Sequence, residues 1–305
     1  MVEVLEVDPQ DERATEAWAS TVTQAVPFVL ATAESVQGQA GRHPHALALL
    51  DDRVVGVGRV RDQTADDGSC GLLLGVLPRE RGSGTGSALM RWTLDRANDF
   101  GAQRLTGATE ETGDVPAMVT HWGFTLGSRS RISWVDARDV PPQEVLGDRL
   151  PSPDLGLVPV EEAGPEAVWQ CHQASIVDDP SGFGHQVPLE AYVEDEWHDP
   201  LLRRDLSHAV VDAQGRVAAF TLLRVAGRRG WSSMTGVHPD HRRRGLSLTV
   251  KAATLRAAAR AGIRRCSTGN SADNAAVLAL NSRLGYQLQM TIRRVERDVS
   301  LGLRR

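Results

Sequence analysis

Hydrophobic and polar residues alternate along the first half of the chain in patterns that predict a succession of strands and helices. Apolar residues recur with helical spacing from Glu12 to Val26. Two apolar runs then flank Asp51-Asp52-Arg53, which is typical of a β-hairpin. A nearly continuous apolar run from Cys70 to Leu77 predicts a strand that is buried on both faces. The elements expected in this half are a helix at 12–26, strands at 45–50, 54–61 and 70–77, a helix at 84–100, a strand at 104–108, a helix at 115–122 and closing strands within 124–136.

The second half repeats this order of elements. Gly101 and Gly262 follow the long helix of each half, at the position where a left-handed glycine commonly ends a helix. Strands early in each half, followed by a β-α-β-α-β order, predict an α+β fold with a mixed central sheet. The elements expected in the second half are a helix at 162–176, strands at 207–212, 216–225 and 231–237, a helix at 245–261, a strand at 264–268, a helix at 274–284 and closing strands from 286 onward.

One turn motif occurs twice in the chain. Residues 76–86 read V-L-P-R-E-R-G-S-G-T-G, and residues 237–247 read V-H-P-D-H-R-R-R-G-L-S. The valine, proline, arginine and second glycine of the first copy recur at a constant offset of 161 residues, as from Val76 to Val237. A constant offset across these residues indicates two copies of one module. Because the segment 140–157 is rich in Pro, Gly and Asp, we predict an N-terminal module at 1–140, a linker at 141–157 and a C-terminal module at 158–305.

The composition limits the classes of function. A length of 305 residues suits two domains, each large enough to bury a core. The formal net charge of −5 offers no basic surface, so nucleic acid is not expected as a partner. Three cysteines in unlike contexts predict no disulfide framework, and no apolar run is long enough to span a membrane. The acidic start of the chain has no signal-peptide pattern, so we expect a cytoplasmic protein without a metal and make no prediction of its oligomeric state. Lys251 is the only lysine, which we attribute to composition alone.

The repeated turn has the chemistry of a phosphate site. A helix that begins after a glycine-rich turn presents free backbone N–H groups and the positive end of its dipole to an anion. Gly84 and Gly245 remove the Cβ that would keep phosphate oxygens away from the backbone, and neighbouring arginines add charge-assisted hydrogen bonds. A dinucleotide-binding turn is disfavoured because the third glycine would fall at Ser87, and a P-loop lacks its Lys-Ser/Thr pair.

The order of elements and the V-x-P-x-x-R-x-x-G-x-G/A turn resemble the GNAT superfamily of acyl-CoA N-acyltransferases. The first copy matches the family's R-x-x-G-x-G pattern, whereas the second has Ser247 where the family has Gly or Ala. The resemblance implies two tandem modules, each with a mixed, mostly antiparallel twisted sheet flanked by helices, and acetyl-CoA as co-substrate. It also implies an oxyanion-stabilising N–H at Val237. The residues expected to bind acetyl-CoA in the two turns are Val76, Arg81, Gly82, Ser83, Gly84, Thr85, Gly86, Val237, His238, Arg242, Arg243, Arg244, Gly245, Leu246 and Ser247.

Three asparagines distinguish the second module from the first. The resemblance implies that Asn270, Asn274 and Asn281 help to position the pantetheine amides. The first module has no amide at the aligned positions, so we expect it to be degenerate and the second to catalyse. A helix N-cap at Asp273 or Asn274 is the alternative interpretation of this cluster, and the two roles are compatible.

Acyl transfer to an amine needs a base for the ammonium, a donor for the oxyanion and an acid for the thiolate. Many family members carry a glutamate on the strand before the turn and a general-acid tyrosine further on. This chain has no acid at 231–236 and has Asn281 at the tyrosine position. Asp179, before Pro180, is our candidate substrate or base residue, with a turn-forming role as the alternative. The other acceptor-side candidates are Asp178, His185, Glu194, Asp195, Glu196 and His198.

The sequence therefore predicts an acetyl-CoA-dependent N-acetyltransferase. The acceptor is expected to be a small-molecule amine that attacks the thioester directly in a ternary complex. Asp178, Asp179 and Glu194 would line the acceptor side and favour a cation. Because the family's glutamate and tyrosine are missing, a non-catalytic acyl-CoA-binding sensor or scaffold remains the alternative.

Overall fold

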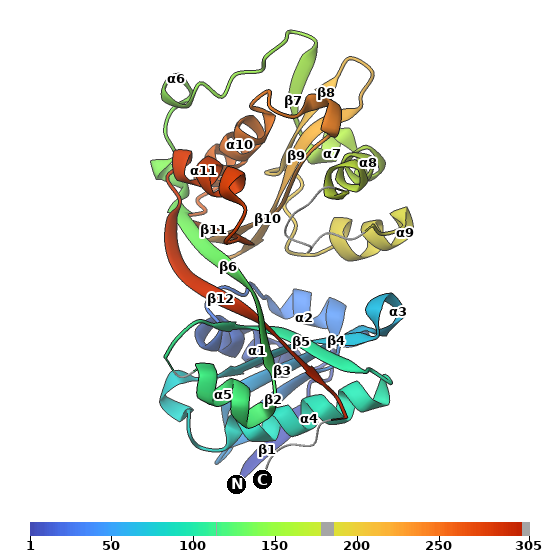
Figure 1. Ribbon diagram of the computed structural model, residues 1–305, viewed down its shortest axis with the longest axis vertical. Helices are drawn as coiled ribbons and strands as arrows, with labels where there is room; N and C mark the ends of the chain where they lie inside the picture. The colour runs from blue at the N-terminus through green and yellow to red at the C-terminus, as the bar shows by residue number, and fades with distance from the viewer. Residues whose placement is uncertain (114, 178–185, 301–305) are drawn as a thin grey trace. The chain divides into compact units, whose positions relative to one another are not determined.

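The computed structural model describes residues 1–113, 115–177 and 186–300, which form two compact units (Figure 1). Unit 1 is Met1–Ser130 together with the C-terminal segment from Met290, and unit 2 is Arg131–Gln289. The predicted α+β class with two modules is confirmed, but the boundaries differ from the predicted 1–140, 141–157 and 158–305. None of the described helices is long and apolar enough to cross a membrane.

Unit 1 has strands in the order β1-β2-β3-β4-β5-β12, with α1 on one face and α4 on the other. Asp51 and Asp52 have φ values of 51° and 60°, as the two central residues of the expected tight hairpin require. Trp18 and Val22 of α1 pack on one face of the sheet, and Met90 and Leu94 of α4 pack on the other. The elements are β1 (Val2–Glu6), α1 (Glu12–Ala25), α2 (Ala33–Ala40), β2 (His45–Leu50), β3 (Arg53–Gln63), α3 (Thr64–Asp67), β4 (Ser69–Val76), η1 (Pro78–Glu80), α4 (Thr85–Asp99), β5 (Arg104–Glu110), α5 (Val115–Trp122) and the first part of β6 (Thr125–Asp136).

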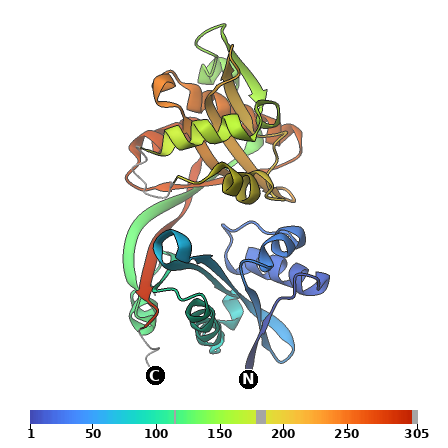
Figure 2. The same ribbon diagram turned by 90° about the vertical axis from the view of Figure 1, so that its right-hand side faces the viewer.

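Unit 2 has strands in the order β6-β11-β10-β9-β8-β7. In Figure 2, α8 crosses one face of its sheet and α10 lies behind the other. Phe220 of β9 packs with Val168 and Cys171 of α8, whereas Leu223 packs with the Leu255 side of α10. The elements are η2 (Ala137–Asp139), α6 (Gln143–Leu146), β7 (Leu155–Pro159), α7 (Val160–Ala163), α8 (Pro165–Ile176), α9 (Leu189–Tyr192), η3 (Val193–Trp197), β8 (His208–Asp212), β9 (Val217–Ala226), β10 (Arg229–Val237), η4 (Pro239–His241), α10 (Leu246–Arg260), β11 (Arg265–Ser271), α11 (Ala275–Arg283) and β12 (Gln287–Asp298).

The closing strands of the two units are exchanged. β6 begins in unit 1 and ends in unit 2, and β12 begins in unit 2 and ends in unit 1. Residues Ile292–Asp298 of β12 pair antiparallel with Glu110–Arg104 of β5. Val295, 4% exposed, joins the core of unit 1 there, whereas Val135 of β6 joins the core of unit 2. The C-terminal strand therefore belongs to the first unit rather than to its own repeat.

The predicted linker is part of unit 2. Leu146 of α6 is 6% exposed and packs in the same cluster as Leu248 and Leu255 of α10. Asp148 forms an ion pair with Arg256. The prediction was wrong because the Pro, Gly and Asp content of 141–157 reflects a short helix and turns that pack on α10 rather than a solvated spacer.

Candidate acyl-CoA site

The turn before α10 leaves backbone N–H groups free at the start of a fifteen-residue helix. Gly245 has a φ of 80° and makes no side-chain capping bond, so it adopts the left-handed conformation that glycine tolerates best. Leu248 and Thr249 donate to the Gly245 carbonyl. Within the described part of the chain, the amides of Leu246 and Ser247 have no acceptor. These amides can bind an anion, as the sequence predicts for the pyrophosphate.

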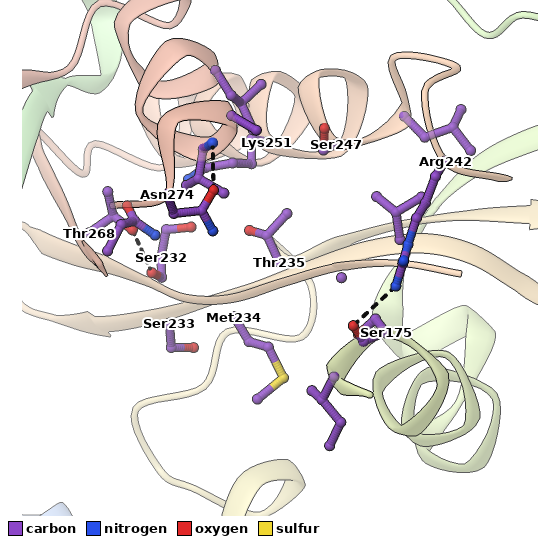
Figure 3. A pocket seen from close by; sticks show the side chains of 18 of the residues that line it. Ser175, Ser232, Ser233, Met234, Thr235, Arg242, Ser247, Lys251, Thr268 and Asn274 are labelled. Carbon is purple, nitrogen blue, oxygen red and sulfur yellow. Dashed lines mark hydrogen bonds between the residues drawn. The ribbon is translucent and has the colours of Figure 1, made fainter. Parts of the chain in front are cut away.

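The turn carries three arginines in succession, Arg242, Arg243 and Arg244. Arg243 has a φ of 60°, the one non-glycine residue of the turn in the left-handed region. The Arg242 guanidinium donates to the Ser175 carbonyl of α8 at 3.4 Å, as Figure 3 shows. Arg244 lies 3.1 Å from Nδ1 of His241. His238, expected beside the ligand, is 36% exposed at its side chain and faces Asp240 at 3.6 Å.

Within the described part of the chain, β10 and β11 pair only over their first residues and separate beyond them. They pair in parallel from Arg229–Arg265 to Trp231–Ser267. Between Ser232 and Met234 the pairing of β10 with β9 shifts by one residue, which is a β-bulge. In Figure 3, Ser232 and Thr235 consequently project towards α10, and Ser233 and Met234 project to the opposite side.

The backbone N–H of Val237 points into this separation. His238 donates its own N–H to the Ala218 carbonyl of β9 at 2.9 Å. Successive N–H groups of an extended strand point to opposite sides, so the N–H of Val237 is directed away from β9 and towards β11. That is the orientation an oxyanion donor at this position requires.

A pocket of about 690 Å³ connects these features. It is lined from α8, β10, the turn, α10, β11 and α11, and none of its described lining residues is a carboxylate. Among the described residues, no group of three or more His, Cys, Asp or Glu side chains is placed to hold a metal ion. Its lining includes His172, Ser175, Ile176, Ser232, Thr235, Val237, Gly245, Leu246, Ser247, Lys251, Thr268, Asn270 and Asn274.

Two of the three predicted asparagines, Asn270 and Asn274, line the pocket, whereas Asn281 is not among its lining residues. Asn274 caps α11 by accepting from the Val277 N–H at 3.2 Å, and it also lines the pocket, so both interpretations of this residue are compatible with the structure. Asn281, 3% exposed, donates to Asn270 Oδ1 at 2.7 Å. Asn281 therefore meets the pocket through its neighbours.

Lys251 is the site residue that the sequence analysis missed. Its side chain lines the pocket, is 3% exposed and donates from Nζ to Asn281 Oδ1 at 2.8 Å. Burial lowers the pKa of this amine to about 8. Comparison of the two repeats could have identified Lys251, because the first repeat has the apolar Met90 at the corresponding position of α4.

The described acceptor-side candidates are not among the residues that line the pocket. Asp178, Asp179 and His185 lie outside the described residues. Glu194 is not among the residues that line this pocket, so it gives the expected anionic lining no support there. Glu196 instead pairs with Arg224 at 2.6 Å, and Asp199 binds the same guanidinium at 2.6 Å. These carboxylates hold η3 and the following loop against β9.

Unit 1 has the same turn with a more crowded surrounding. Gly82 and Gly84 have φ values of 82° and 86° before α4. The Ser83 hydroxyl lies 2.7 Å from that of Thr85, which is 1% exposed. The Trp122 ring lies 3.3 Å from the position a Cβ would take on Gly86.

The strand before the turn also differs in unit 1. β3 and β4 pair without a register shift from Gly56–Val76 to Gln63–Ser69. Leu72 and Leu74 of β4 stand at the positions of Ser233 and Thr235 in β10 and pack against the apolar core of unit 1. The N–H of Leu77 donates to Val55, so that of Val76 points away from β3. Unit 1 thus has the turn but lacks the β-bulge and the polar side chains of the strand that precedes it.

Comparisons with known proteins agree with this geometry. Residues 10–124 match the model of the "Acetyltransferase (GNAT) family", and residues 165–275 match that of the "Acetyltransferase (GNAT) domain". A mycothiol acetyltransferase of Clavibacter michiganensis subsp. michiganensis is 36% identical over 102 residues, which are 32% of this chain and 31% of that protein. The match thus spans about a third of that relative.

Solved structures of similar fold cover almost the whole chain. A tandem GNAT protein from the clavulanic acid biosynthesis pathway has a TM-score of 0.74 at 19% identity, with 99% of this chain and 100% of that chain covered. A GCN5-related N-acetyltransferase from Sphaerobacter thermophilus has a TM-score of 0.68 at 17% identity, with coverage of 99% and 96%. At these identities the likeness shows the fold. With a family model matched in each half, the chain belongs to the GNAT family of acetyltransferases, as a tandem member.

Proposed function

We propose that this protein is an acetyl-CoA-dependent N-acetyltransferase that acetylates a small-molecule amine, and that unit 2 holds the working site. The observation that carries the proposal is one pocket that joins the free amides of α10 to the N–H of Val237. The pyrophosphate would occupy the amides of Leu246 and Ser247, with Arg242, Arg243 and Arg244 around it. The pantetheine arm would follow the separation between β10 and β11, beside Asn270 and Asn274.

The reaction follows from where the thioester would lie. An amine bound on the α8 side of the pocket attacks the thioester carbonyl carbon directly. The tetrahedral intermediate carries a negative oxygen, which the N–H of Val237 stabilises. Asp179 stays our proposed acceptor-side residue, because α8 ends at Ile176, which lines the pocket three residues earlier in the chain.

A comparison of the two units supports the assignment to unit 2. In unit 1, leucines replace the polar residues of the strand, Thr109 replaces Asn270 and Val119, 8% exposed, replaces Asn281. We therefore propose that unit 1 is degenerate and that Arg81, Gly82, Ser83, Gly84, Thr85 and Gly86 bind acetyl-CoA weakly or only support the fold.

The test is thiol release from acetyl-CoA with a panel of small primary amines, with the product identified by mass spectrometry. We expect turnover with at least one amine and calorimetric binding of CoA with micromolar to millimolar affinity. Binding without turnover by any acceptor would favour the alternative of an acyl-CoA-binding sensor. No heat of binding at millimolar CoA would refute a CoA site altogether.

A further inference from the structure

Lys251 occupies a position where the fold does not need an amine. It lies six residues after Gly245 in α10, and Met90 lies six residues after Gly84 in α4. Met90 is fully buried in the apolar core of unit 1. The corresponding helix of unit 1 therefore buries an apolar side chain at this position. A lysine there, the only one in the chain, calls for an explanation other than packing.

The described neighbours of the Lys251 ammonium are neutral groups. In the described part of the chain no carboxylate lies within ion-pair distance of Nζ, whose hydrogen-bond partner is the neutral Asn281 amide. The Tyr286 ring centroid lies 5.2 Å away, a distance at which an aromatic face attracts a cation. A buried ammonium without a counter-ion is unfavourable, so the site is suited to an anion that arrives or forms in the pocket.

Acyl transfer from a thioester creates such an anion. When the tetrahedral intermediate collapses, the carbon–sulfur bond breaks and its electron pair leaves on the sulfur as a thiolate. Val237 and Lys251 line the same pocket, in which Ser232 and Thr235 project towards α10 (Figure 3). We propose that the Lys251 ammonium is the general acid that protonates the departing CoA thiolate; this inference rests on the proposed function.

The step balances without a further reactant. The acceptor nitrogen forms the new bond to carbon and later loses its extra proton to solvent. The sulfur takes a proton from Nζ and leaves as the neutral thiol. Neutral Lys251 keeps its contact with Asn281 Oδ1 and regains a proton from water before the next cycle. Asn281 positions the amine, since its own Nδ2 is held by Asn270 Oδ1.

The proton affinity of Lys251 suits this role. Its pKa, lowered to about 8 by burial, is near that expected of a thiol. Among the described residues, the Tyr286 ring packs against Lys251 and the Cys266 thiol of β11 interacts with Tyr286, and burial raises the pKa of both. Both groups are neutral near pH 8, so neither of them produces a limb of the pH profile at that pH.

The first variant is Lys251→Met, which installs the residue that α4 carries at the same place. We expect kcat to fall by about 100-fold, the usual contribution of a general acid, with the KM for acetyl-CoA changed by less than about threefold. The decline of wild-type kcat as pH rises through about 8 should disappear. A kcat within threefold of wild type, or a rise in KM alone, would overturn the proposal.

Lys251→Arg separates proton donation from charge. Arginine keeps the positive charge but holds its proton too tightly to transfer it. We expect a loss of kcat close to that of Lys251→Met. Wild-type kcat in Lys251→Arg would show that the charge alone acts, which contradicts a general acid.

A binding measurement judges the proposal even if no amine is turned over. The thiol of bound CoA is titrated by its thiolate absorbance, with the acceptor absent. We expect its pKa to be lowered in the wild-type protein relative to free CoA and not lowered in Lys251→Met. Equal thiol pKa values in the two proteins would refute the contact, whereas failure of the amine panel alone would refute only the proposed function.

Discussion

Arg256 of α10 holds Asp148 from a segment 108 residues earlier in the chain. Its Nη1 donates to Asp148 Oδ2 at 2.7 Å, and its Nη2 donates to Oδ1 at 3.1 Å. The same Nη2 also donates to the Pro141 carbonyl. The Asp148 side chain is 2% exposed. The pair therefore ties the segment around Asp148 to the C-terminal half of α10, the helix that begins at the anion-binding turn.

Asp148→Ala should destabilise the protein. The substitution leaves the Arg256 guanidinium with one carbonyl partner in a largely buried place, and breaking a buried pair costs about 3 kcal/mol. The measurement is urea unfolding at neutral pH. Asp154→Ala, an exposed position in the same segment, is the control and should change the unfolding free energy by less than about 0.5 kcal/mol. Equal effects of the two substitutions would mean that the pair does not anchor the segment.

Fragments of the chain should fold according to the observed units. We expect residues 131–289 to give a cooperatively unfolding fragment and residues 158–305 to aggregate. The 158–305 fragment lacks Val135, Leu146 and Leu155, which are all buried in unit 2. It also contains the part of β12 that pairs with β5 of unit 1. The measurement is yield of soluble fragment followed by thermal unfolding. A well-folded 158–305 fragment would contradict the strand exchange.

Local chemistry was readable from the sequence, and long-range pairing was not. The Asp51-Asp52 hairpin and the helix ends at Gly101 and Gly262, with φ values of 71° and 80°, are as expected, because each depends on a few neighbouring residues. The partner of a closing strand depends on which sheet edge is open, which the alternation around Val295 does not specify. The repeat therefore predicted two modules correctly and assigned the C-terminal strand to the wrong one.

The candidate site shows the same division. The turn residues from Arg242 to Ser247 and the Asn274 cap follow from local rules. Lys251 lies in the middle of an alanine-rich helix, and only the tertiary contact with Asn281 gives it a meaning. The sequence does distinguish Lys251 in one way, because the corresponding residue of the other repeat is Met90.

Gly245→Asp and Gly84→Asp form a matched pair. Both glycines are left-handed with open space at the Cβ position, so the conformational cost of about 1 kcal/mol is the same in each. In Gly245→Asp the carboxylate would face the pyrophosphate and displace hydrogen bonds to it. We expect kcat/KM to fall at least about 30-fold, equivalent to roughly 2 kcal/mol. Gly84→Asp should retain most activity, and the reverse result would move the working site to unit 1.

The three thiols should be unreactive in the native protein. Burial raises the pKa of Cys70 to about 11 and those of Cys171 and Cys266 to about 12. Because the thiolate is the nucleophile, we expect no reaction with an aromatic disulfide reagent at pH 8 and three thiols per chain in urea. One thiol reacting rapidly without denaturant would contradict the burial of that cysteine, and the bound-CoA titration would then need a variant lacking it.

Lys251→Met should raise stability in a pH-dependent way. The amine has a pKa of about 8 in the folded protein and 10.5 in the unfolded chain, so between these values the unfolded state binds more protons. The unfolding free energy of the wild type therefore rises with pH across this window. Below pH 8 both states are protonated and the full penalty, roughly 3 kcal/mol, is present. Lys251→Met lacks this penalty, so its advantage in urea unfolding should be largest at pH 7 and should have shrunk by pH 10. Comparing the two proteins at each pH cancels the titration of the other groups, and a constant difference would refute the buried ammonium.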